Sequence, residues 1–421
     1  MEKVTVSENG IPIYYYPNEQ LHSFCLSLYI KAGSMYEPDD RNGATHLWEH
    51  MVFRKLNKLY NNRFYQILDI LGLSFSACTY REFVQLQITG APEHFRESAK
   101  IMGFVFEPMN LTGKELELEK RRIKSEIREN DEEHSLEYFS KKLVWENTPL
   151  ANTISGKNKV IDKIGVNVLQ QIQTEICSSG NLFFYITGCF KKEDVAFLSN
   201  CIAPYELASG ELHTNSAPVP KRMFQRDAQI EIKNSKYNCV FFSFDIDVTR
   251  YSYAELNVIY DILFSGENSK VYQQLSEQSG YIYSFDARLE RYSNVGSLSF
   301  TFEVQKKNIL PSIEKVVRIL SELKTAVTDE LLYVLPTYVD NAEFILDSDE
   351  ELNWNRAYEC HIMGNSHQSV QEEKQQYQKI TPERIQTIAG EIFTRNNMIL
   401  TLKTEKKTFP VEEASKLIRR L

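Results

Sequence analysis

The hydrophobic and polar positions of the chain follow two periods, the two-residue period of strands and the longer period of helices. The first two predicted strands are joined by Asn9-Gly10, a dipeptide typical of hairpin turns. The strands predicted in the first half are residues 4–6, 11–14, 23–31, 73–78, 83–89 and 182–187. Helices are predicted at residues 43–55, 63–71, 114–145 and 168–176. Because strands and helices are mixed without regular βαβ alternation, the pattern predicts an α+β fold.

The second half of the chain repeats this order of elements. Its predicted strands are residues 238–247, 281–288 and 296–304, and its predicted helices are residues 253–264, 310–323 and 330–346. The parallel order suggests an internal duplication. Residues 208–222 are small, polar and proline-containing, which is typical of a linker. We therefore expect two tandem domains of the same fold, 1–207 and 223–421, each a mostly antiparallel sheet with helices packed on one face.

Composition narrows the class of protein. A chain of 421 residues exceeds one comfortable hydrophobic core, and its net charge of −9 argues against nucleic acid as a partner. Seven scattered cysteines without a C-x-x-C pair indicate reduced thiols and a cytoplasmic protein. No run of 18 apolar residues predicts a membrane-spanning helix. The first residues enter a strand pattern directly, without an apolar signal core, so we expect neither a secretory signal nor a membrane association.

One short stretch of the first half contains a motif of possible metal ligands. His46 and His50 lie four positions apart, and Glu49 lies between them. On a helix, both imidazoles face the same side and suit zinc, while the adjacent carboxylate suits a general base. The alternative is a helix with two incidental histidines, but an H-x-x-E-H motif is expected by chance only ~0.01 times in such a chain. This spacing predicts a zinc site for amide hydrolysis.

A catalytic zinc site needs a third protein ligand, and the charged helix predicted at residues 114–145 offers many carboxylates. Most of these belong to a solvated face with i,i+4 ion pairs. Leu116, Ile123 and Ile127 define the buried stripe of this helix. The carboxylates at or near the edge of that stripe are Glu115, Glu119, Glu126 and Glu133. Helical phase alone does not choose among them.

The stretch from Gly43 to Phe53 resembles the G-x-x-H-x-x-E-H-x-x-F segment of the family that contains pitrilysin, insulin-degrading enzyme and mitochondrial processing peptidase. In that family a glutamate on a later helix completes the zinc site, and a second glutamate seven residues earlier supports it. The resemblance implies one zinc ion per chain. It also implies these roles: zinc ligands His46, His50 and Glu126, general base Glu49 and supporting residue Glu119.

Residues 265–283 resemble the family's second-domain segment, in which an arginine and a tyrosine hold the substrate and stabilise the oxyanion. Tyr283 matches that tyrosine, but Ser276 stands where the arginine is expected. A serine cannot supply the fixed charge and forked donors of a guanidinium. Either the chain alone is a weak or differently binding enzyme, or a paralogous subunit without zinc ligands supplies the arginine. The second interpretation is favoured, and the chain is half of the family's four-domain clamshell, so we expect a hetero- or homodimer.

These observations predict a zinc-dependent endopeptidase that acts on short or unfolded peptides, with leader removal from precursor peptides as one role. The partners expected are a peptide substrate and a paralogous subunit or a second copy of the chain. One rival is a non-catalytic, scaffold-like subunit, which the presence of Glu49 argues against because a scaffold needs no base. Another rival is a binding protein with an accidental motif, which metal analysis would identify.

Overall fold

The computed structural model describes residues 2–130, 135–145, 148–208, 229–365 and 369–421. It divides into two compact units, each built from several segments of the chain. Unit 1 comprises residues 1–132, 152–215 and 343–369, and unit 2 comprises residues 133–151, 216–342 and 370–421. These units differ from the predicted domains 1–207 and 223–421 by the exchange of two segments. Most of the predicted linker 208–222 lies outside the described residues.

Unit 1 is built on a six-stranded sheet in the order β1-β2-β6-β3-β5-β4. All neighbouring pairs are antiparallel except β2 and β6. The strands are β1 Lys3–Val6, β2 Pro12–Pro17, β3 Phe24–Ile30, β4 Ser74–Thr79, β5 Val84–Gly90 and β6 Leu182–Gly188. The longer helices are α1 Ala44–Leu59, α2 Phe64–Leu71, α3 Phe95–Gly103, α4 Gly113–Asn130, α7 Val166–Ile176 and α8 Lys192–Ile202, with the short helix α6 at Asn158–Ile161.

Unit 2 repeats this topology with a five-stranded sheet in the order β7-β11-β8-β10-β9. The pair β7 and β11 is parallel and the others are antiparallel, so the sheet corresponds strand by strand to β2-β6-β3-β5-β4 of unit 1. Its strands are β7 Gln229–Asn234, β8 Cys239–Ile246, β9 Asp286–Arg291, β10 Gly296–Glu303 and β11 Met398–Thr404. Its helices are α5 Leu136–Val144, α9 Tyr253–Phe264, α10 Ile309–Glu322, α11 Thr328–Val339, α13 Val370–Gln378, α14 Pro382–Ile392 and α15 Val411–Ile418.

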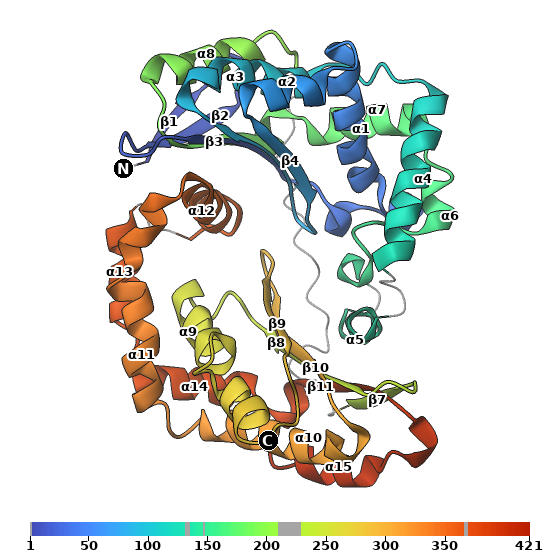
Figure 1. The fold of residues 1–421 in the computed structure, drawn as a ribbon, viewed down its shortest axis with the longest axis vertical. Coiled ribbons are helices and arrows are strands. Elements are labelled where there is room, and N and C mark those ends of the chain that lie inside the picture. Colours follow the sequence, from blue (N-terminus) through green and yellow to red (C-terminus); the bar gives the residue numbers. More distant parts are fainter. Residues whose placement is uncertain (1, 131–134, 146–147, 209–228, 366–368) are drawn as a thin grey trace. The chain divides into compact units, whose positions relative to one another are not determined.

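The prediction of an α+β fold with two mostly antiparallel sheets is confirmed, and the shared topology supports the expected duplication. In unit 1, Figure 1 shows α3 and α8 on one side of the sheet and α12 (Asp349–Trp354) on the other. Every residue of β3 is buried because both faces are covered. Within the described chain, no helix is both long and apolar enough to cross a membrane.

One face of each sheet is covered by a helix from the other half of the sequence. Asn353 of α12 donates hydrogen bonds to the carbonyls of Cys25 and Tyr185 on the sheet of unit 1. In unit 2, α5 packs against β8 and β11, and Ser140 of α5 hydrogen-bonds Thr401. Both helices occur at the same place in the repeated order of elements, so the two halves exchange equivalent helices.

The prediction of one helix over residues 114–145 is wrong. The helix α4 ends at Asn130, and α5 begins at Leu136 in the other unit, with residues 131–134 outside the described part. The side chain of Ser135 accepts a hydrogen bond from the Tyr138 backbone N–H and caps the new helix. A polar cap residue therefore starts a second helix inside a stretch whose charge pattern looks continuous.

A glycine contact fixes the start of α1. Gly43 has φ +92°, and a Cβ there would lie 2.7 Å from Gly156 Cα. Gly72 also has positive φ (+61°), but nothing lies within 4 Å of its position for a Cβ. We expect Gly72→Ala to destabilise by about 1–2 kcal/mol through backbone strain, and Gly43→Ala by about 1–3 kcal/mol more through overlap. Urea unfolding of the two variants measures this difference, and equal losses would contradict the role of the contact.

Candidate metal centre

Two packed helices of unit 1 carry the predicted metal ligands. His46 and His50 lie one turn apart on α1, and Glu126 lies on α4. The Nε2 atoms of His46 and His50 lie 3.7 and 3.6 Å from the Glu126 carboxylate oxygens. One ligand atom from each of the three residues lies within 4.8 Å of the others. The structure therefore brings these three predicted residues together.

The distances fit a shared ion better than hydrogen bonds. An N–H···O hydrogen bond spans about 2.7–3.2 Å, so 3.6–3.7 Å is too long. Two ligands of one tetrahedral zinc, each at about 2.0–2.2 Å from the metal, lie roughly 3.4 Å apart. Two imidazoles and a carboxylate form the donor set of a catalytic zinc site, which keeps a fourth position open. The residues present therefore fit zinc.

Burial keeps His46 in the form that binds metal. It lowers the pKa of His46 to about 4, with a smaller contribution from the nearby His50 and opposition from Glu49. The imidazole is therefore neutral near pH 7, with a lone pair available for an ion. The Nδ1 atom of His46 is buried and has no hydrogen-bond partner among the described residues.

Glu119 supports the second histidine. Its Oε2 lies 3.3 Å from Nδ1 of His50, so a proton on Nδ1 leaves Nε2 free on the side of Glu126. Its Oε1 accepts a hydrogen bond from Nε of Arg54 at 2.5 Å. Burial raises the pKa of the Glu119 carboxyl, but the bonds from His50 and Arg54 outweigh burial and hold it below its usual value. Glu119 is thus ionised and orients the imidazole of His50.

Helix geometry explains the seven-residue spacing of the two glutamates. Residues 46, 50, 54 and 58 recur every turn on α1, and their partners on α4 run in the opposite direction, from Glu126 through Glu119 to Glu115. Glu115 lies at the far end of this row, where it accepts hydrogen bonds from Thr112 and pairs with Lys58. Glu115 therefore caps α4 and is not part of the metal cluster, while Glu133 lies outside the described residues.

Glu49 faces the sheet beside the cluster. It is buried, and its Oε2 accepts a hydrogen bond from the hydroxyl of Thr79 at 2.6 Å. Thr79 is the last residue of the edge strand β4. Sequence reasoning found Glu49 from its place in the motif, but it missed Thr79 because only the fold places this strand beside α1.

The N-terminus of α1 is held by a buried carboxylate that the sequence analysis also missed. Glu37 accepts hydrogen bonds from the backbone N–H groups of Gly43 and Thr45, both at 2.7 Å. A negative group at this end of a helix stabilises the helix dipole. Burial raises the pKa of Glu37 in spite of these bonds. Glu37 thus anchors the turn that precedes His46.

Tyr283 belongs to unit 2, whereas the metal cluster is assembled within unit 1. Its side chain is 94% exposed and contributes to a cavity of about 400 Å3 with Tyr260, Phe264 and Tyr272. The prediction of a strand over residues 281–288 is wrong at its start, because β9 begins at Asp286. Tyr283 therefore lies in the loop before the strand, and Ser276 lies in a π-helical segment, Tyr272–Glu277.

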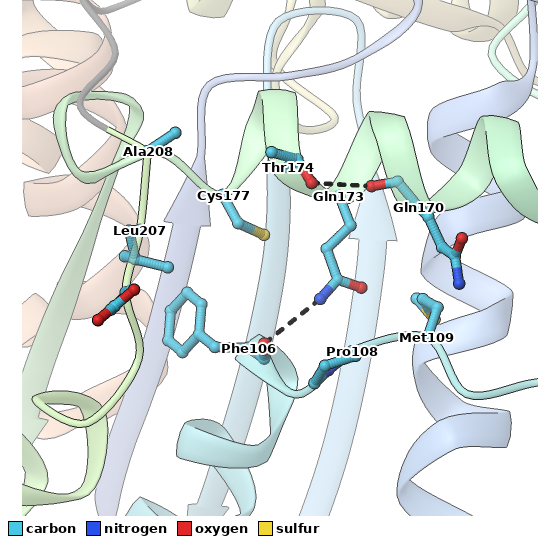
Figure 2. Close-up of a pocket in the computed structure, with 10 residues that line it drawn as sticks. Phe106, Pro108, Met109, Gln170, Gln173, Thr174, Cys177, Leu207 and Ala208 are labelled. Carbon is cyan, nitrogen blue, oxygen red and sulfur yellow. Dashed lines mark hydrogen bonds between the residues drawn. The ribbon is translucent and has the colours of Figure 1, made fainter.

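A separate cavity of about 300 Å3 lies beside α7 (Figure 2). Figure 2 shows Phe106, Cys177 and Leu207 along its wall, and Gln173 donates hydrogen bonds from Nε2 to the carbonyls of Phe106 and Glu107. None of the motif residues lines this cavity. This cavity is therefore separate from the candidate metal centre, which side chains of α1 and α4 form.

Arg54 offers a test of the support given to the cluster. We expect Arg54→Met to weaken zinc binding by about 10-fold, because it removes the partner that orients Glu119 without removing a ligand. The matched control is Lys58→Met, one turn further along α1, where the lysine lies 3.7 Å from Glu115 and donates a hydrogen bond to the Asn110 carbonyl. Competition with a chelator measures both affinities. Equal affinities of the two variants would show that Arg54 does not act on the metal site.

Comparisons with known proteins indicate the family of the chain. Residues 15–158 match the model of the insulinase family of peptidases (family M16), and residues 163–334 match that of the M16 inactive domain. The chain is 19% identical over 406 residues to an uncharacterized zinc protease, YmxG, of Bacillus subtilis, covering 94% of this chain and 97% of the relative. It is 21% identical over 322 residues to a non-peptidase homolog, YmxG, of Helicobacter pylori, covering 74% of this chain and 73% of the relative. The crystal structure of a protease from Helicobacter pylori matches with a TM-score of 0.84 at 15% identity, covering 96% of this chain and 99% of that one.

Proposed function

The chain belongs to the insulinase (M16) family of peptidases, and from that premise we propose that it is a zinc-dependent endopeptidase of short or unfolded peptides. The observation that carries the proposal is the convergence of His46, His50 and Glu126 with a buried carboxylate, Glu49, beside them. A family of peptidases can contain members without activity. In this chain, the three candidate ligands and the candidate base of the proposed reaction are all present in unit 1.

Each residue of the cluster has a defined task in the proposed reaction. A zinc ion bound by the three ligands would polarise the scissile carbonyl and acidify a water. Glu49 accepts the proton of the attacking water and passes it to the leaving amide nitrogen, which departs as an amine. Glu119 and Arg54 keep His50 oriented throughout, and the neutral His46 does not compete for the proton.

The sheet of unit 1 supports an extended peptide as the substrate. Among the described strands, β4 has one neighbour, β5, so its other edge offers unpaired backbone groups. Ser74, Ser76 and Cys78 of β4 are exposed, and the strand ends at Thr79, which contacts Glu49. An extended chain can add to such an edge through backbone hydrogen bonds, whereas most of the backbone of a folded domain is already paired within the domain. This favours unfolded peptides over folded proteins.

Ser276 supports the proposal of a second subunit. Loss of a charged donor to the oxyanion costs about 10²–10³-fold in rate, and a serine cannot replace a guanidinium. We therefore assign the chain the zinc-bearing role in a dimer, preferably with a paralogue that supplies the arginine. Tyr283, exposed in its loop, is assigned to the oxyanion in the same proposal.

The test is hydrolysis of a mixed library of unstructured peptides by the purified chain, with zinc content and solution mass determined in the same preparation. We expect about one zinc per chain and slow cleavage that a chelator abolishes, because the purified chain lacks the arginine. Zinc without cleavage would direct the search to a paralogous partner, whose addition should then restore activity. Absence of zinc would overturn the proposal.

A non-catalytic subunit is the second candidate, and the non-peptidase homolog from Helicobacter pylori favours it. Such a subunit has no use for a buried carboxylate beside two histidines, which costs stability unless it serves chemistry. The two candidates differ in one result. A scaffold gives no cleavage with any partner, even when its zinc site is full.

A further inference from the structure

Thr79 lies behind the proposed base and is the one described residue that hydrogen-bonds it. Its hydroxyl donates to Glu49 Oε2 at 2.6 Å, and both side chains are buried. A hydroxyl bound to an ionised carboxylate forms a stronger hydrogen bond than a neutral pair does. Among the described residues Glu49 accepts no other hydrogen bond, so its Oε1 remains available to a water.

The sheet fixes the position of this hydroxyl. Thr79 pairs with Val84 of β5 in regular antiparallel register. Phe75 and Ala77, which share its face of β4, pack against the hydrophobic core of unit 1. Threonine is also stiff about χ1, so its hydroxyl has few alternative positions. The donor is thus held by the sheet, while the base that it contacts is held by α1.

A glutamate side chain has three rotatable bonds, so the backbone of α1 alone does not fix the position of the Glu49 carboxylate. We propose that Thr79 is a positioning residue that holds Oε2 of Glu49 and so presents Oε1 to the attacking water. This inference rests on the proposed peptidase function, because the positioned group is the base of that reaction. The hydrogen bond would hold the base in its reactive position before the substrate binds. A misplacement of a catalytic group by about 1 Å can cost on the order of 10²-fold in rate.

Replacement of the hydroxyl by a methyl group of the same shape tests the inference. We expect Thr79→Val to lower kcat by about 10- to 100-fold, while KM and the zinc content stay unchanged. Thr79→Ser keeps the hydroxyl and should restore most of kcat. The matched control is Thr89→Val, the same chemical change on β5, which pairs with Ser74 at the other end of β4 and should leave kcat unchanged.

Two outcomes would overturn the inference. One is a Thr79→Val protein with the kcat of the wild type. The other is a Thr79→Val protein that loses zinc or stability in the same proportion as activity, with no rescue by Thr79→Ser, which would indicate a merely structural role.

A readout without catalysis separates this inference from the proposed function. Crystal structures of the zinc-loaded wild type and Thr79→Val show directly whether the Glu49 carboxylate moves. A carboxylate held as described in the wild type and rotated in the variant supports the inference. An identical carboxylate position in both proteins would overturn it, whatever peptides the chain cleaves.

Discussion

Glu49→Gln is expected to abolish peptide hydrolysis while the protein keeps its zinc. The amide has nearly the shape of the carboxylate and can still accept the Thr79 hydrogen bond, but it cannot take a proton from water. Loss of a general base costs about 10²–10⁴-fold in rate. The measurement is kcat on a cleaved peptide from the library, with zinc content determined on the same sample.

The control for this variant is Glu117→Gln, which removes an exposed carboxylate from α4, the helix that carries Glu119 and Glu126. We expect it to leave both activity and zinc content unchanged. If Glu49→Gln were as active as the wild type, Glu49 would not be the base. If the variant lost its zinc as well, the loss of activity would reflect a damaged site and not the missing base.

The part of the candidate site that follows from the sequence is the part within one helix. His46, Glu49 and His50 lie within two turns, so their mutual arrangement depends only on helical geometry. The contacts of Glu126 and Glu119 with the histidines depend on the antiparallel packing of α1 on α4, which helical phase alone does not predict. The resemblance to a known family chose these two glutamates, and the structure places both against the histidines.

The fold shows the same limit. Local periodicity predicted the six strands of unit 1 and three strands of unit 2 (β8, β9 and β10), but it missed β7 and β11. It also could not show that α5 and α12 cross to the opposite unit. That exchange is decided by tertiary contacts, such as the hydrogen bonds of Asn353 to the sheet of unit 1. Thr79 was missed for the same reason, because a threonine at the end of a strand carries no local sign of its partner.

Glu126→Gln is expected to weaken zinc binding more than about 100-fold, because Glu126 is assigned as a ligand. Loss of a residue that only hydrogen-bonds a ligand costs roughly 10–100-fold in affinity. It is the carboxylate that lies within 3.7 Å of both histidines. Glu115→Gln is the matched control on the same helix, since Glu115 caps α4 and contacts Lys58 instead. Isothermal titration of the metal-free proteins with zinc gives the three affinities directly.

The same assignment predicts a loss of metal-dependent stability. A ligand that binds only the folded chain stabilises it by about 2.7 kcal/mol at 100 times its Kd, so zinc should raise the unfolding temperature of the wild type. At the same zinc concentration, Glu126→Gln should show little of this rise, while Glu115→Gln should show all of it. If Glu126→Gln kept the full rise and Glu133→Gln lost it, the third ligand would be Glu133, another of the carboxylates that helical phase allows.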